Sequence, residues 1–219
     1  MDADRLVATV RRRLVSPDLE IEGRRDWPDR VVFKTNWHFY EAQPADWLIG
    51  GAPWVAEAVR LVATDGVGSM ARTYGLLFGR SGEEFLLNDV QTVRTLGGRL
   101  GDDLDPVAYA EVLAELYSGR DIEGPIVTPV SVSEWARPGE LVRDVADVVA
   151  KYPFVAPELV APPAVEVVDD EVRLAFHSCH YRRGGSGGGL DILHWTVTGG
   201  GGRPAAWSRR YVVEDLQRP

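Results

Sequence analysis

The chain has 219 residues, 45% of them hydrophobic and 26% charged, so it is long enough to fold around a core without disulfide bonds. Its formal net charge of −9 makes nucleic acids and anionic membranes poor electrostatic partners. A single cysteine excludes an internal disulfide, the N-terminus does not resemble a signal peptide, and no apolar run approaches the roughly 20 residues of a membrane span. We therefore expect a cytoplasmic protein that binds neither nucleic acid nor membrane.

The first part of the chain mixes helical and strand patterns. Apolar residues at helical spacing predict an amphipathic helix over residues 3–14. Period-two alternation over residues 31–40 predicts one half-buried strand, with His38 on its polar face. Residues 53–63 are expected to form a second helix, because Pro53 suits a first helical turn, where its missing N–H costs nothing.

The middle of the chain is predicted to contain a hairpin, over residues 70–80 and 83–87, followed by helices. Helical spacing together with capping residues predicts three further helices, over residues 88–96, 105–118 and 138–152. Residues 153–163 contain Pro153, Pro157, Pro162 and Pro163. We expect this segment, the strap, to be extended, and it is the possible boundary within the chain.

Residues 164–216 predict four consecutive strands, separated by Asp169-Asp170 and by two glycine-rich stretches. A segment of this size that consists of strands has little core of its own, so we expect it to complete a sheet with the N-terminal strands. The sequence thus predicts a single α+β domain over residues 1–219. Its sheet would be mostly antiparallel, would include the C-terminal four-strand meander, and would be packed with about four to five helices.

Two of these C-terminal strands carry three chemically active side chains on one face. Alternation places Phe176 and Trp195 on the apolar face. It places His177, Cys179 and His194 on the opposite face. A register that keeps the apolar faces together sets either His177 or Cys179 directly opposite His194. In both registers the three groups are within cross-strand reach.

This face has two chemical interpretations and one structural interpretation. Two imidazoles and a thiol suit zinc with an open coordination position, or a thiolate–imidazolium nucleophile. His38 would join as an acid–base partner if its strand lay alongside. However, a lone intracellular cysteine usually packs as a small hydrophobic side chain, and histidines on a sheet are often merely hydrogen-bonded. We therefore expect a protein without metal or cofactor.

Three other sequence motifs do not indicate a functional site, because the elements predicted around them do not suit that function. The glycine loop at residues 66–71 lies between a predicted helix and a strand, the reverse of the order in dinucleotide-binding folds. No helix follows Ser186, so its glycine-rich surroundings do not indicate a nucleophile elbow. Asp102, Asp103 and Asp105 precede a predicted helix, and carboxylates there complement the helix dipole.

The failed motifs and the negative charge favour a non-catalytic, acidic binding protein, such as an immunity-like or regulatory partner of another protein. The alternative is an enzyme or ligand-binding protein that acts on a small molecule through His177, Cys179 and His194, with His38 as a possible helper. An enclosed pocket over that face would favour the alternative. An exposed apolar patch elsewhere would favour the binding protein.

Overall fold

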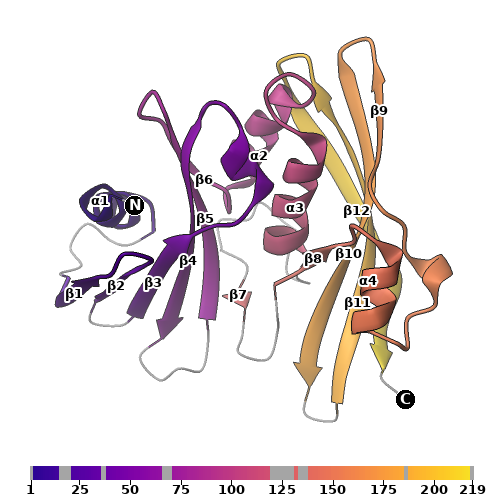
Figure 1. Ribbon diagram of the computed structural model, residues 1–219, viewed down its shortest axis with the longest axis horizontal. Helices are drawn as coiled ribbons and strands as arrows, with labels where there is room; N and C mark the ends of the chain where they lie inside the picture. The colour runs from indigo at the N-terminus through magenta and orange to yellow at the C-terminus, as the bar shows by residue number, and fades with distance from the viewer. Residues whose placement is uncertain are drawn as a thin grey trace.

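Two antiparallel sheets, with helices between them, organise the chain (Figure 1). The computed structural model describes residues 2–14, 21–35, 38–65, 71–118, 131–132, 138–184 and 187–217. Within these ranges the C-terminal strands form a sheet of their own. The expectation that they share a sheet with the N-terminal strands is therefore wrong. Helices lie between the two sets of strands and cover the side of each sheet that faces the other.

The first sheet follows the chain order β1-β2-β3-β4-β5-β6, and β7 also pairs with β5. Its strands are β1 (Gly23–Asp26), β2 (Val31–Lys34), β3 (His38–Pro44), β4 (Val55–Asp65), β5 (Ala71–Gly79), β6 (Glu84–Leu86) and β7 (Ser131–Val132). The second sheet has the order β12-β11-β10, and both β8 and β9 pair with β10. Its strands are β8 (Glu140–Leu141), β9 (Ala164–Val168), β10 (Glu171–Gly184), β11 (Gly187–Gly200) and β12 (Arg203–Gln217).

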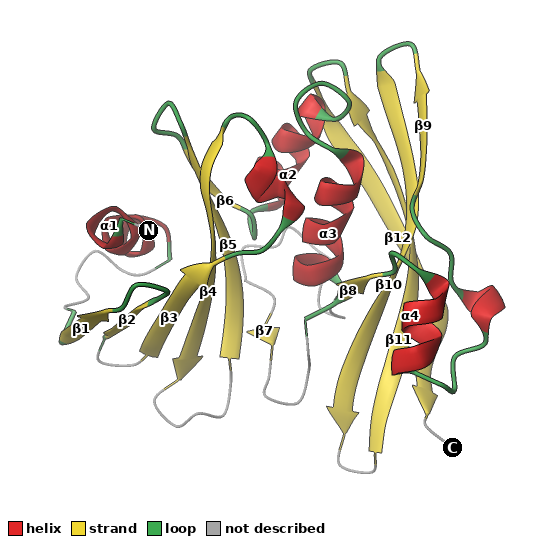
Figure 2. Ribbon diagram, in the orientation of Figure 1, coloured by secondary structure: helices red, strands yellow, loops and turns green. Residues whose placement is uncertain are grey.

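Four α-helices are present in the described part of the chain, and they form layers with the sheets (Figure 2). They are α1 (Ala3–Arg13), α2 (Val90–Leu96), α3 (Pro106–Tyr117) and α4 (Val145–Lys151), and there are short 3-10 turns η1 (Leu48–Gly51), η2 (Gly97–Arg99) and η3 (Pro157–Leu159). α1 packs on the outer side of the first sheet, α2 and α3 lie between the sheets, and α4 lies outside the second sheet. We call the two faces of the second sheet inner (toward α2 and α3) and outer (toward α4). None of the described helices is long and apolar enough to cross a membrane.

Several predicted elements are confirmed. α1, α2 and α3 occupy the predicted segments, and the Asp105 carboxylate caps α3 by accepting a hydrogen bond from the Ala108 N–H at 2.9 Å. β5 and β6 form the predicted hairpin. The C-terminal meander is present as β9–β12, and Asp169 and Asp170 form its first turn with φ of 47° and 64°, which two acidic turn residues tolerate.

Three predictions are wrong in detail. Residues 53–63 fall mostly in β4, in which Val59, Leu61 and Ala63 are buried with the period of a strand. Residues 31–40 form the hairpin β2–β3 rather than one strand, and residues 36–37 between its strands lie outside the described residues. The helix expected over residues 138–152 is confined to α4, because β8 pairs with β10 first.

Two predicted loops fall wholly or partly outside the described residues. They are the glycine loop, of which residues 66–70 are not described, and Ser186 with its glycine neighbour Gly185.

Candidate functional site

β10 and β11 pair in one of the two predicted registers, the one that sets His177 directly opposite His194. The two ring centroids are 5.0 Å apart and the ring planes are inclined by 61°. Both side chains are half-buried on the outer face. One residue earlier on β10, Phe176 lies opposite Trp195 on the inner face. The sequence pattern therefore assigned the faces of these four residues correctly.

The strap contacts one member of the histidine pair, His177. Nδ1 of His177 lies 3.2 Å from the backbone N and 3.3 Å from the backbone O of Ala161, so it accepts from the N–H or donates to the carbonyl according to its tautomer. On the other side, Arg210 of β12 lies opposite His194. Burial, the neighbouring His194 and Arg210 lower the pKa of His177, against the opposing effect of the Ala161 hydrogen bond.

Burial and Arg210 likewise lower the pKa of His194. Because the ordinary value is 6.5, both rings are mainly neutral at pH 7. The two rings are thus neutral imidazoles, of which His177 can exchange a hydrogen bond with Ala161 of the strap. They do not present the imidazolium that a thiolate–imidazolium pair requires.

Cys179 shares the outer face but lies in a different environment. Its side chain is 2% exposed, in an apolar cluster formed by α4, the strap and the lower part of the sheet. Burial raises the pKa of the thiol to about 12, helped by Glu140 and opposed by Lys151. At neutral pH this group is a buried thiol, so the geometry does not supply the thiolate that a nucleophile or a zinc ligand needs. Among the described residues, no group of three histidine, cysteine or acidic side chains is placed to hold a metal ion.

His38 lies on β3 of the first sheet, so α2 and α3 separate it from the histidines of the second sheet. Its carbonyl accepts a hydrogen bond from Thr35 N–H at 2.9 Å, and its ring centroid lies 6.0 Å from that of Tyr40. The structure thus brings together His177 and His194, buries Cys179 beneath α4, and places His38 elsewhere.

The inner face carries a buried polar group that the sequence analysis did not identify. His180 lies opposite Asp191, and these residues are 7% and 0% exposed. His180 Nδ1 is 4.0 Å from Asp191 Oδ2, and Asp191 Oδ1 accepts a hydrogen bond from the Asp215 N–H at 2.9 Å. This carboxylate therefore helps to fix the irregular register of β11 and β12 near Leu190. The signal was available, because alternation from Phe176 places His180 on the core side.

Ser178 lies on the same inner face, next to the end of α3. It accepts a hydrogen bond from Trp195 Nε1 at 2.8 Å, and its Oγ is 2.9 Å from that of Ser118. Ser178, His180 and Asp191 are all buried, so we interpret them as polar groups of the core rather than as a nucleophile with its base.

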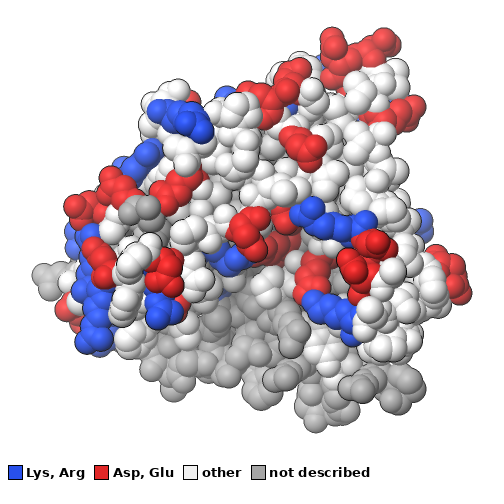
Figure 3. Space-filling model, in the orientation of Figure 1, with Lys and Arg blue, Asp and Glu red and all other residues white. Residues whose placement is uncertain are grey.

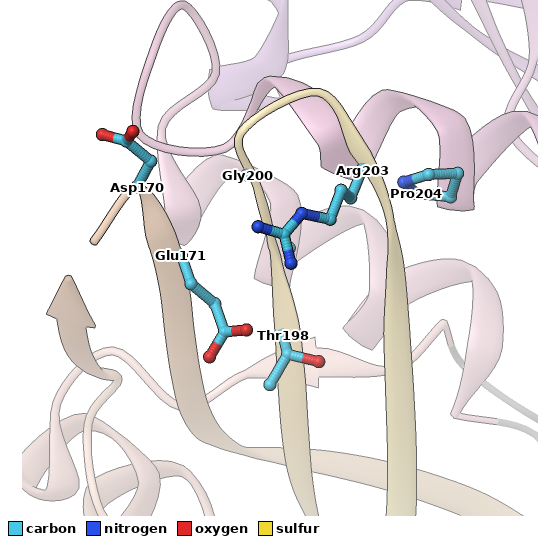
Figure 4. Close-up of a pocket in the computed structure, with 7 residues that line it drawn as sticks. Asp170, Glu171, Thr198, Gly200, Arg203 and Pro204 are labelled. Atoms are coloured by element: carbon cyan, nitrogen blue, oxygen red, sulfur yellow. The ribbon is translucent and has the colours of Figure 1, made fainter. Parts of the chain in front are cut away.

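A hollow of about 110 Å³ lies at the turn between β11 and β12 (Figure 4). Asp170, Glu171, Thr198, Arg203 and Pro204 line it together with two glycines. In Figure 4 the Arg203 guanidinium points toward Glu171 and Thr198, whereas the Asp170 side chain points away. The single basic group in this lining is offset by two acidic ones, so the hollow carries no excess of positive charge for an anion.

A larger hollow of about 600 Å³ lies between residues 48–53 and 101–108. The predicted acidic cluster lies at this hollow, and two of its carboxylates have structural partners. Asp105 caps α3, and Asp103 accepts a hydrogen bond from Arg99 at 3.2 Å. The Asp105 contact supports its interpretation as a group that complements the start of a helix, whereas Asp103 forms an ion pair with Arg99.

β9 presents an exposed apolar surface. All five of its residues are exposed, and Val165, Val167 and Val168 expose 45%, 63% and 38% of their area. Within the described residues β9 pairs with β10 alone, so its other edge is open. β9 lies at the margin of the second sheet in Figure 1, and Figure 3 shows acidic side chains gathered around the projecting end of the β9–β10 hairpin.

Comparisons with protein-family models, with curated proteins and with solved structures find no match to this chain.

Proposed function

We propose that this chain is a non-catalytic, acidic binding protein whose partner is another protein that adds an extended strand to the open edge of β9. Three exposed valines on this one edge strand carry the proposal. Edge strands of soluble proteins are normally protected by covering elements, because their free backbone groups pair readily with other chains. An exposed apolar edge therefore supports a role in binding, of the kind that a regulatory or immunity-like partner performs.

The backbone geometry of β9 supports strand addition. A two-residue turn places its flanking residues, Val168 and Glu171, in a hydrogen-bonded pair, and such pairs alternate along an antiparallel ladder. The next hydrogen-bonded pair is Glu166 with Arg173. The N–H and C=O groups of Val165 and Val167 therefore point to the open edge, where an added strand would bind them.

The alternative is small-molecule chemistry at the outer face. The 5.0 Å separation of His177 and His194 favours it. Against it, both imidazoles have a lowered pKa, the Cys179 thiol has a raised one, and His38 belongs to the other sheet. Binding at β9 needs none of these groups.

The proposal is tested with Val167→Pro. Proline removes the N–H that faces the open edge but leaves the hydrogen bonds between β9 and β10 in place, because Val167 occupies a non-hydrogen-bonded position in that ladder. Immobilised wild-type protein should retain a cellular protein that the variant does not retain, as measured by quantitative mass spectrometry and then with the purified partner. Val167→Ile, which keeps the N–H and the strand propensity, is the matched control. Equal retention by Val167→Pro and Val167→Ile, at equal thermal stability, would contradict strand addition at this edge.

A further inference from the structure

We infer that Glu166 determines which strand can bind to β9: it keeps a second copy of this chain away and selects a partner strand with lysine or arginine opposite it. The inference rests on the proposed strand addition. Glu166 is the central residue of β9 and lies between Val165 and Val167. No other residue of the strand is charged.

The carboxylate of Glu166 has no hydrogen-bond partner among the described residues, although its charge interacts with that of Arg173. Its cross-strand neighbour is Arg173, but the Arg173 guanidinium donates to Glu171 at 2.9 Å. Among the described residues, no hydrogen bond or ion pair joins the Glu166 side chain, and the residue is exposed. Glu166 thus presents an exposed negative charge on the outer face, next to the row of backbone groups at the open edge.

A second copy of the chain is the most obvious strand that could pair with β9. The antiparallel register of greatest overlap would set Val165 of each copy against Val167 of the other. It would also set the two Glu166 residues directly opposite, as a non-hydrogen-bonded pair with Cα atoms about 4.5 Å apart. Like charges at such positions destabilise a sheet.

The neighbouring registers are worse for pairing. A shift toward the strap sets Val167 against Pro163, which has no N–H to donate. The opposite shift sets Val165 against Asp169, a turn residue with positive φ. The open edge therefore disfavours its own copy in each of these three antiparallel registers.

A strand with alternating basic and apolar residues meets none of these obstacles. Residues opposite Val165 and Val167 continue the inner face, since those valines lie opposite Leu174 and Val172, and apolar side chains suit that position. The residue opposite Glu166 lies on the outer face. Around it, the end of the hairpin adds Asp169, Asp170 and Glu171 against Arg173, so the local field attracts a cation.

The test uses two synthetic peptides, one of alternating lysine and valine and one of alternating glutamate and valine, both acetylated and amidated. Wild-type protein should bind the lysine peptide more tightly. Glu166→Arg should shift the ratio of the two dissociation constants by about tenfold toward the glutamate peptide, because one attraction becomes a repulsion. Fluorescence anisotropy of labelled peptides at physiological salt measures both ratios, and Glu166→Gln should give an intermediate value.

Two outcomes separate this inference from the proposed function. If Val167→Pro abolishes peptide binding while Glu166→Arg leaves the ratio unchanged, β9 is a docking edge but Glu166 does not select its partner. If Val167→Pro leaves lysine-peptide binding unaltered, strand addition at this edge is itself refuted. A wild-type protein without preference for the lysine peptide also overturns the selection.

The exclusion of a second copy has its own measurement. Glu166→Val should produce a concentration-dependent dimer in sedimentation velocity, and adding Val167→Pro to that variant should restore the monomer. A wild-type dimer that Val167→Pro dissociates would show that Glu166 does not prevent self-pairing. A monomeric Glu166→Val variant would overturn the exclusion as well.

Discussion

Two cross-strand pairs, one residue apart on the same two strands, have opposite surroundings. Phe176 and Trp195 stack with ring centroids 5.5 Å apart and are fully buried on the inner face. His177 and His194 have centroids 5.0 Å apart on the outer face, where both are half-buried and His177 contacts the strap. The register of β10 and β11 brings the two residues of each pair together in the same way. What covers each face decides whether a pair stabilises the core or remains accessible, so proximity alone is weak evidence for a catalytic site.

The largest expected effect comes from the inner pair. Phe176→Ala should lower the free energy of unfolding by about 3–5 kcal/mol, because it removes a fully buried ring and leaves a cavity against Trp195. Urea denaturation followed by tryptophan fluorescence measures the loss. Thr196→Ala, on the exposed outer face of the neighbouring strand, is the control: it removes one exposed hydrogen bond to Ser208 and should cost less than about 1.5 kcal/mol. Equal losses for the two variants would contradict the assignment of faces.

The outer pair should matter much less for stability. His177→Ala and His194→Ala should each cost less than about 1.5 kcal/mol, because a half-buried imidazole loses little buried area and at most one backbone hydrogen bond. His177→Ala should also increase amide exchange at Ala161, which the His194 change should leave nearly unaltered. A loss for His177→Ala as large as that for Phe176→Ala would make the histidines core groups.

The smallest expected effect is a pH dependence that belongs to the outer pair alone. The pKa values of His177 and His194 are lowered in the folded state from 6.5, so the unfolded chain binds protons first as the pH falls. Their contribution to stability is complete above pH 6.5 and is lost as the pH falls from there through the lowered folded-state values. Comparing urea midpoints of wild type and of the His177→Gln, His194→Gln double variant between about pH 5 and pH 8 isolates this term. Parallel curves for the two proteins would show that the histidines do not titrate differently on folding.

Much of the second sheet was predictable because, over most of its area, helices cover the inner face and leave the outer face uncovered. Period-two burial is clear in Val172, Leu174 and Phe176, and the Asp169-Asp170 turn limits the register. β4 was not predictable in this way because it is a central strand buried on both faces. Val59 and Leu61 belong to the cluster under α1, whereas Val55 and Ala58 belong to the central cluster. Their combined pattern resembles a helical stripe.

The candidate site was predictable only as far as local geometry extends. The ladder implied the contact of His177 with His194. It carried no sign that α4 and the strap fold over Cys179, since that is a tertiary contact between segments with no pairing signal. The prolines of the strap indicated an extended segment but not what it covers, and nothing local assigned His38 to a different sheet. The single-domain organisation stays a prediction, although one central cluster includes residues of both sheets.

The sequential strand order described above has a consequence for how the chain folds. From β1 to β6 and from β9 to β12, consecutive strands are neighbours, so most sheet contacts close short loops and their contact order is low. Each meander can therefore form early and independently. The contacts that join them include those of α2 and η2 with β12, and those of α3, which contacts β5 of the first sheet and β8 and β10 of the second. We expect docking of the preformed meanders onto α3 to be the rate-limiting event, and substitutions on α3 to slow refolding more than substitutions in the hairpin turns.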